Sequence, residues 1–229
     1  MQIHLILLNR IEPLIPKKHE NRINYWFSEK NKIELGKILR VIYSEEDETI
    51  RNFFLVAFSH ILKSCSIWLQ ESTKPTRDLN KTSSKPYEAF RRHLMKMQKG
   101  NEAFYRIVPP KVRDNLNQYL KIRISDARKQ SVQDESVDLV ITSSPYVTSY
   151  EYADLHQLST IWLDLANDLT KYKKEFIGTS SRKYENKRLK SLIAMDIVNK
   201  VTEKSKKQQG KLKLFLLIWR KFLMRVSES

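Results

Sequence analysis

Glycine and cysteine are scarce in this sequence, which has four glycines and one cysteine in 229 residues. Average glycine usage of about 7% predicts roughly sixteen glycines in a chain of this length. The shortage favours a helix-rich protein with few tight turns, or a chain from which glycine-bearing loops are missing. The single Cys65 excludes an internal disulfide bond, so a reducing cytoplasm is the expected location.

Long hydrophobic runs are also absent from the sequence. The run Ile3–Leu8 lacks the basic start, the apolar length and the small-residue cleavage site of a signal peptide. The run Leu212–Trp219 is interrupted by Lys213 and is too short to span a bilayer. We therefore expect no contact with a membrane. The histidine, cysteine and acidic residues show no metal-ligand spacing, so no metal site is predicted.

Positive charge is in large excess, with 42 Lys+Arg against 26 Asp+Glu and a formal net charge of +16. Such an excess favours binding to a polyanion, because cations that contact phosphates release condensed counterions. A solvated basic surface in a protein from a lysine-rich proteome would have the same composition. Charge alone leaves both interpretations open.

The first part of the chain is predicted to be mainly helical. Ser28 is a predicted N-cap of a helix that runs through Ile42, in which Gly36 costs about 1 kcal/mol relative to alanine. A second helix is predicted from Asp47 to Leu69, and its broad apolar face implies burial on more than one side. The aromatic residues of this region occur at helical spacing, which favours core packing over base stacking.

Residues 71–90 are predicted to form a loop, because proline, small hydroxyl and basic residues occur there without periodicity. This loop is either a mobile linker or a DNA-contacting segment whose cations reach phosphates. A basic helix over residues 88–105 follows, and a charged stretch lies at residues 171–190. His93 on the helix is interpreted as a solvated neighbour of its arginines. The candidate nucleic-acid-binding residues of these segments are Lys74, Arg77, Lys81, Lys85, Arg91, Arg92, Lys96, Arg182 and Lys183.

Two apolar segments later in the chain predict neighbouring strands of one sheet. Ile122–Ile124 is followed by an acidic turn at Asp126, and Val137–Thr142 is an apolar, β-branched run typical of a buried strand. The second run ends abruptly in Ser143-Ser144-Pro145-Tyr146. Ligands of open α/β sheets bind just beyond the carboxyl ends of strands, so this is where chemistry is expected.

The stretch Val137–Tyr146 resembles motif IV of the DNA amino-methyltransferases, in which a Ser-Pro-Pro-Tyr motif serves methylation of an exocyclic base nitrogen. The following sequence Tyr-Glu-Tyr-Ala-Asp-Leu-His strengthens the match, because aromatic and acidic residues follow the motif in one branch of the family. The resemblance extends over residues 21–206 and includes the segments Tyr25-Trp26-Phe27 and Arg51–Ser59.

The resemblance implies a role for each motif residue. Ser143 would accept a hydrogen bond from the target amine, and Ser144 or its neighbour would present a carbonyl to it. Pro145 would stiffen the turn, and Tyr146 would stack on a flipped base. Serine at position 144 replaces the family's first proline, which frees the backbone where the carbonyl must be aimed. Asp126 matches an upstream acidic residue near the cofactor or base pocket, with capping of the next helix as the alternative.

The cofactor implied by the resemblance is S-adenosylmethionine, which the family binds with a glycine-rich Phe-x-Gly-x-Gly turn. No two glycines of this chain are near each other in the sequence, so that motif is absent. In the related branch it precedes the Tyr-Trp-Phe segment, and we therefore expect a separately encoded upstream piece to carry it. Residues 207–229 contain no acid until Glu228, where the family has an acidic amphipathic helix. A frameshift near residues 208–211 would explain this difference.

These features together predict an α/β fold, a partial Rossmann-like methyltransferase sheet with a large helical N-terminal portion. The expected organisation is a helical region at 1–120, a catalytic region at 121–206 and an out-of-frame tail at 207–229. The expected function is methylation of double-stranded DNA in a restriction–modification system, with cytosine N4 favoured over adenine N6. Activity is expected to require the missing cofactor segment. A non-catalytic nucleic-acid-binding protein with a vestigial motif IV and an RNA methyltransferase are the alternatives.

Overall fold

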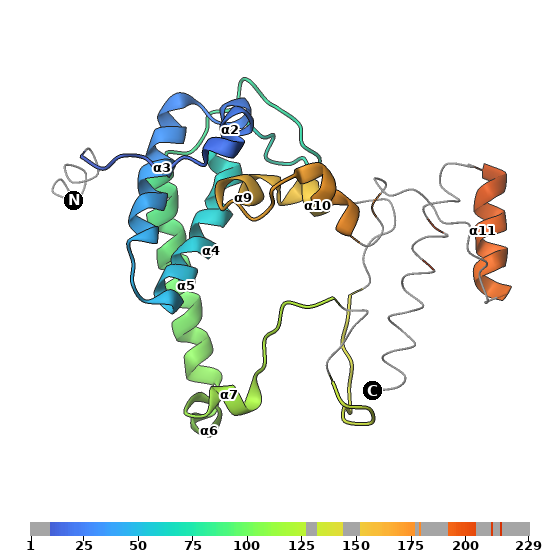
Figure 1. Cartoon of the computed structure of the whole chain (residues 1–229). Helices are drawn as coiled ribbons and strands as arrows, with labels where there is room; N and C mark the ends of the chain where they lie inside the picture. Colours follow the sequence, from blue (N-terminus) through green and yellow to red (C-terminus); the bar gives the residue numbers. More distant parts are fainter. Residues whose placement is uncertain are drawn as a thin grey trace. The chain divides into compact units, whose positions relative to one another are not determined.

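The structure is a computed structural model that describes residues 10–126, 132–143, 152–176, 179, 192–204, 212 and 216 (Figure 1). The chain divides into two compact units. One unit consists of Met1–Leu120 and Leu155–Asn167, and the other of Lys121–Asp154 and Asp168–Ser229. The segment Leu155–Asn167 therefore returns to the first unit after the chain has entered the second.

The regular secondary structure described in the first unit is helical, apart from one isolated β-bridge in a loop. Three long helices, α3, α4 and α5, pack against one another, and the short helix α9 packs against α2 and α4 (Figure 1). None of the described helices combines the length and apolar character needed to cross a membrane. The helices of this unit are η1 (Lys17–His19), α2 (Glu20–Trp26), α3 (Glu29–Tyr43), α4 (Glu48–Cys65), α5 (Pro86–Ile107), α6 (Pro110–Arg113), α7 (Leu116–Tyr119) and α9 (Gln157–Trp162).

Side-chain caps fix where α3 and α4 begin, and Ser28 is the N-cap that the sequence predicts for α3. The Ser28 hydroxyl accepts a hydrogen bond from the Asn31 backbone N–H at 3.3 Å, and a carboxylate oxygen of Asp47 accepts from two backbone N–H groups of the first turn of α4, at 2.8 and 3.0 Å. Helix α4 ends at Cys65, four residues before the predicted end. There Ser66 is extended and its hydroxyl donates to the Lys63 carbonyl at 2.9 Å, which turns the chain into the next loop.

Aromatic residues form much of the core of this unit. Trp26 and Trp68 are each 1% exposed and stack at a ring-centroid distance of 5.2 Å. The rings of Phe27 and Phe58 meet Trp162 of α9 edge to face, at 5.6 and 5.8 Å. The prediction that these aromatic residues serve core packing is therefore confirmed for them.

Gly36 is where the segment before η1 packs onto α3. A Cβ atom at this position would lie 2.8 Å from the Pro13 Cβ and 3.3 Å from the Leu14 backbone nitrogen. The Leu14 N–H donates to the Gly36 carbonyl at 2.9 Å, so the backbones are in direct contact. The glycine that weakens α3 thus allows this close approach.

The loop between α4 and α5 is held by many hydrogen bonds, which favours an ordered segment over the alternative of a mobile linker. Backbone bonds of 2.9 and 2.8 Å, from Leu69 to Thr76 and from Asp78 to Ile67, flank an antiparallel bridge between Trp68 and Arg77. The Ile67 N–H also donates to the Trp26 carbonyl at 2.9 Å, and this joins the loop to the end of α2.

The second unit contains helices α10 (Leu169–Glu175) and α11 (Leu192–Lys204), and α8 (Tyr152–Leu155) crosses the boundary between the units. The Asp168 carboxylate caps α10 by accepting from two backbone N–H groups, and these bonds lower the pKa of Asp168. The Lys173 ammonium group pairs with Asp154 at 2.5 Å.

The predicted strands of this unit are not formed by the described residues. Val137–Thr142 has no strand partner there, and its side chains are exposed, with Leu139 74% and Ile141 86% accessible. A strand requires a ladder of hydrogen bonds to a neighbour, and the bridge between Trp68 and Arg77 is isolated. The expectation of a buried strand is therefore not met in this structure, although the helical half of the fold prediction is confirmed.

Candidate nucleic-acid interface

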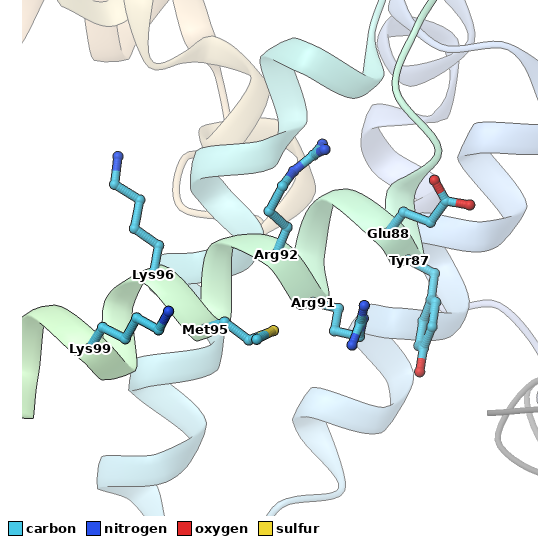
Figure 2. Close-up of a pocket in the computed structure, with 7 residues that line it drawn as sticks. All are labelled: Tyr87, Glu88, Arg91, Arg92, Met95, Lys96 and Lys99. Carbon is cyan, nitrogen blue, oxygen red and sulfur yellow. The ribbon is translucent and has the colours of Figure 1, made fainter.

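Four cations of α5 line one depression on its surface. Arg91, Arg92, Lys96 and Lys99 line a depression of about 730 Å³ together with Tyr87, Glu88 and Met95 (Figure 2). We call these four cations the α5 basic face. Arg92 and Lys96 extend from one side of the helix, while Arg91 and Tyr87 extend from the other. The helical period explains the arrangement, because residues three or four apart lie above one another on the same face.

The charges of the α5 basic face are not neutralised within the described part of the chain. All four side chains are exposed, and none forms an ion pair with a described residue. The carboxylate of Glu88 lies 3.3 Å from the Lys85 ammonium group, and both side chains are exposed. Free guanidinium and ammonium groups along a helix suit contact with successive phosphates of a polyanion.

The cations predicted in the loop have different environments. Lys74 is exposed, and the Arg77 guanidinium lies 4.2 Å from the centre of the Tyr25 ring. The Lys81 ammonium group donates to the carbonyls of Lys63 and Trp68 at 2.9 and 2.6 Å, and to the Gln70 side chain at 3.3 Å. Burial, followed by the charge of Lys63, lowers the pKa of Lys81. All three N–H donors of Lys81 therefore have acceptors in the protein.

His93 lies against another histidine rather than against the arginines alone. Its ring stacks on that of His60 from α4, with a centroid distance of 3.7 Å and an angle of 4° between the planes. Burial, then the neighbouring His60 and Lys96, lower the pKa of His93. Among the described residues, no group of three or more histidine, cysteine or acidic side chains is placed to hold a metal ion.

The residues predicted for catalysis are described only in part. Asp126 lies in an exposed irregular segment of the second unit, where it has an interaction with other residues, and Ser143 ends the exposed segment that begins at residue 132. Ser144, Pro145 and Tyr146 lie outside the described residues, as do Arg182 and Lys183. The structure therefore describes the arrangement of the basic helix and loop. The arrangement of the motif residues stays a prediction.

Two residues near the loop were not predicted from the sequence. Arg22 and Tyr25 lie on α2, and the Arg22 guanidinium is 5.1 Å from the Tyr25 ring centre. Tyr25 is 43% exposed, unlike its buried neighbours Trp26 and Phe27. Helical spacing could have indicated this, because Arg22 and Tyr25 are three residues apart and share a face. The contact of Arg77 with the Tyr25 ring depends on how the loop folds, and no spacing in the sequence indicates it.

The chain is similar to a known methyltransferase. The chain is 28% identical over 160 residues to a Type II methyltransferase, M.MvaI, of Kocuria varians. The aligned region covers 65% of this chain and 34% of the relative, so the chain spans about a third of the length of the curated relative it matches. No family model matches the chain. No solved structure matches it either.

Proposed function

We propose that this chain is part of a DNA methyltransferase that methylates an exocyclic base amine, cytosine N4 in preference to adenine N6. The observation that carries this proposal is the similarity to a Type II methyltransferase over 160 residues. The Ser-Ser-Pro-Tyr motif and the α5 basic face support it from independent parts of the chain. Duplex DNA is the proposed substrate, because the α5 basic face offers phosphates four cations that have no ion-pair partner among the described residues.

In this proposal the motif residues act on the target base. The Ser143 hydroxyl accepts a hydrogen bond from the exocyclic NH2 group, which keeps the amine nitrogen pointed at the methyl donor. Ser144 or its neighbour contributes a backbone carbonyl, and Pro145 restricts the turn. Tyr146 stacks on the base after it has left the duplex. Polar acceptors fixed around the amine would stabilise the positive charge that develops on nitrogen during transfer.

S-adenosylmethionine would supply the methyl group, and the described residues of this chain do not form a site for it. Asp126 is exposed on an irregular segment, and no glycine-rich turn accompanies it in the sequence. We propose that a separately encoded upstream piece holds the cofactor. The same piece would supply strands beside Val137–Thr142, whose exposed apolar side chains would then be buried in a Rossmann-like sheet.

Methyl transfer with and without the upstream piece tests the proposal. The full chain is co-expressed with the product of the upstream reading frame and incubated with duplex DNA and tritiated S-adenosylmethionine. We expect label in DNA only when both pieces are present. Hydrolysis of the DNA to nucleosides then identifies the product as N4-methylcytosine or N6-methyladenine. Ser143→Ala should lower incorporation at least tenfold, because it removes the proposed acceptor.

Ser136→Ala is the matched control. Ser136 lies on the same described segment, and its hydroxyl donates to the Gln133 carbonyl at 2.7 Å, away from the motif in sequence. This variant should retain the activity of the parent pair. Absence of label with both pieces present, together with intact DNA binding, would contradict the enzymatic proposal. The chain would then be a non-catalytic nucleic-acid-binding protein.

A further inference from the structure

Two arginines from different parts of the first unit meet at one exposed tyrosine. The Arg77 guanidinium carbon lies 4.2 Å from the Tyr25 ring centre, and the Arg22 guanidinium carbon lies 5.1 Å from it. The two guanidinium groups are therefore no further apart than the sum of these distances. We call these residues the Arg22–Tyr25–Arg77 cluster. All three side chains are exposed.

The position of Arg77 is fixed by the backbone around it. Arg77 forms the bridge to Trp68, and the hydrogen bonds on either side of that bridge measure 2.9 and 2.8 Å. The bond from the Ile67 N–H to the Trp26 carbonyl attaches this part of the loop to the end of α2, one residue after Tyr25. The ordered loop thus places Arg77 close to the Tyr25 ring, so that less conformational entropy is lost when the guanidinium group contacts the ring.

The position of Arg22 is fixed by α9. One terminal nitrogen of the guanidinium donates to the Gln157 side-chain oxygen at 2.9 Å, and Gln157 is 2% exposed. The same guanidinium lies 5.9 Å from the Trp26 ring. A guanidinium group has five N–H donors, so most of those of Arg22 remain available to a ligand.

The cluster brings two like charges together without a compensating acid. Neither arginine has a carboxylate partner among the described residues. The face of the tyrosine ring attracts each guanidinium, yet it carries no net charge and cannot neutralise them. Bringing an anion to the cluster would remove the repulsion between the arginines and satisfy their free N–H groups.

We propose that the Arg22–Tyr25–Arg77 cluster binds the phosphodiester backbone of a nucleic acid, as a second contact separate from the α5 basic face. This inference rests on the proposed function, which makes DNA the substrate. A planar guanidinium held against an aromatic ring presents its N–H edge in a fixed direction, and that geometry matches phosphate oxygens. A phosphodiester fits better than a base, because the arginines already occupy contacts with the ring.

Protection of individual arginines from a dicarbonyl reagent tests the inference. The full chain is treated with phenylglyoxal, alone, with duplex DNA, or with inorganic phosphate, and modified arginines are located by mass spectrometry. We expect duplex DNA to slow modification of Arg22 and Arg77 at least fivefold. Arg40, an exposed arginine on α3, should be modified at the same rate in every sample. Inorganic phosphate should protect the cluster more weakly than DNA does.

The modification of Arg91 and Arg92 on α5 distinguishes a failure of this inference from a failure of the proposed function. Protection of Arg91 and Arg92 without protection of Arg22 and Arg77 would overturn the cluster as a site and leave the α5 basic face as the DNA contact. Protection of Arg22 and Arg77 without Arg91 and Arg92 would support the cluster and contradict the α5 contact. If DNA and phosphate protect none of them, both proposals fail.

Substitution provides a second readout. Arg22→Gln and Arg77→Gln should each weaken duplex binding about five- to tenfold, and each should lower the slope of log affinity against log salt by about one. Arg40→Gln removes the same charge and should change binding less than twofold. Equal binding by all three variants, with a lower melting temperature for Arg77→Gln, would show that the arginines only hold Tyr25 in place.

Discussion

Lys81 is a predicted DNA contact whose donors are all directed into the protein. Its ammonium group joins the end of α4 to the loop through the carbonyls of Lys63 and Trp68. Lys81→Met keeps most of the length of the side chain but removes the ammonium donor from both carbonyls, of which that of Lys63 still accepts from the Ser66 hydroxyl. We expect a loss of about 1–3 kcal/mol in the free energy of unfolding, measured by urea denaturation.

Lys74→Met is the matched control, because Lys74 is an exposed lysine of the same loop. It should change stability by no more than about 0.5 kcal/mol. If the two variants are equally stable and Lys81→Met instead weakens DNA binding more than Lys74→Met does, the hydrogen bonds of Lys81 are dispensable and its predicted phosphate contact is the better interpretation.

At the scale of elements, Gly36 and Gly100 lie inside long described helices. Replacement by alanine is expected to change stability in opposite directions at these two positions. A Cβ at Gly100, in the exposed half of α5, would meet no atom within 4 Å apart from the adjacent residues and backbone of its own helix. Gly100→Ala should therefore stabilise the chain by about 1 kcal/mol, the difference in helix propensity. Gly36→Ala gains the same propensity, yet its Cβ would meet Pro13 at 2.8 Å. We expect a net destabilisation, because backbone atoms must move apart.

Thermal unfolding of the two variants beside the parent chain measures this difference. The Cβ added in Gly36→Ala should also displace the segment before η1 from its position on α3. Limited proteolysis near residue 12 should therefore be faster in Gly36→Ala only. An increase in melting temperature for Gly36→Ala would contradict the packing described for Gly36.

The stacked histidines of α4 and α5 predict a loss of stability in mild acid. The pKa of His93 is lowered from its ordinary value of 6.5, so the folded chain binds this proton less readily than the unfolded chain. Stability should therefore fall as the pH drops below 6.5 and stop falling below the folded-state pKa. Protonation would place charge beside His60 and Lys96.

Urea midpoints at pH 7.5 and pH 5.5 test this prediction in the parent chain and in His93→Gln. The variant should lose less stability on acidification than the parent. His156→Gln, which replaces an exposed histidine, should behave like the parent. An unchanged pH dependence in His93→Gln would exclude the stacked pair as the source.

Sequence periodicity predicted the helices of the first unit well, because their signals are local. Ser28 and Asp47 are caps whose partners lie within three residues, and the apolar faces of α3 and α4 follow the helical repeat. The end of α4 was missed by four residues, since Ser66 and the loop bonds that stop it are not visible in periodicity.

At the scale of the whole molecule, the net charge of +16 predicts binding that is sensitive to salt. Replacing Arg91, Arg92, Lys96 and Lys99 together by glutamine should lower the slope of log affinity against log salt by about three to four, as measured by fluorescence anisotropy with a labelled duplex. A fourfold replacement of other exposed lysines, at positions 30, 111, 121 and 171, is the control. Equal slopes for the two variants would indicate a diffuse basic surface.

The candidate site could be predicted from the sequence only where its residues lie close together along the chain. The α5 basic face was predicted because its cations recur at helical spacing. The Arg22–Tyr25–Arg77 cluster was missed, because Arg77 reaches Tyr25 through a bridge and a loop that join residues far apart in sequence. The strand predicted at Val137–Thr142 shows the reverse case, since a local pattern indicated burial that requires partners elsewhere.

Helix α5 is unevenly supported along its length, and this has a consequence for its dynamics. Ala89 near its start is buried, whereas every residue from Gln98 to Ile107 is exposed. Backbone hydrogen bonds in the exposed half are supported by helix propagation more than by packing. Amide hydrogens of one continuous helix should therefore exchange with deuterium at two rates, slow in the turns near Ala89 and fast beyond Gln98. The basic residues Lys96 and Lys99 lie at the boundary between the slowly and the rapidly exchanging parts of the helix.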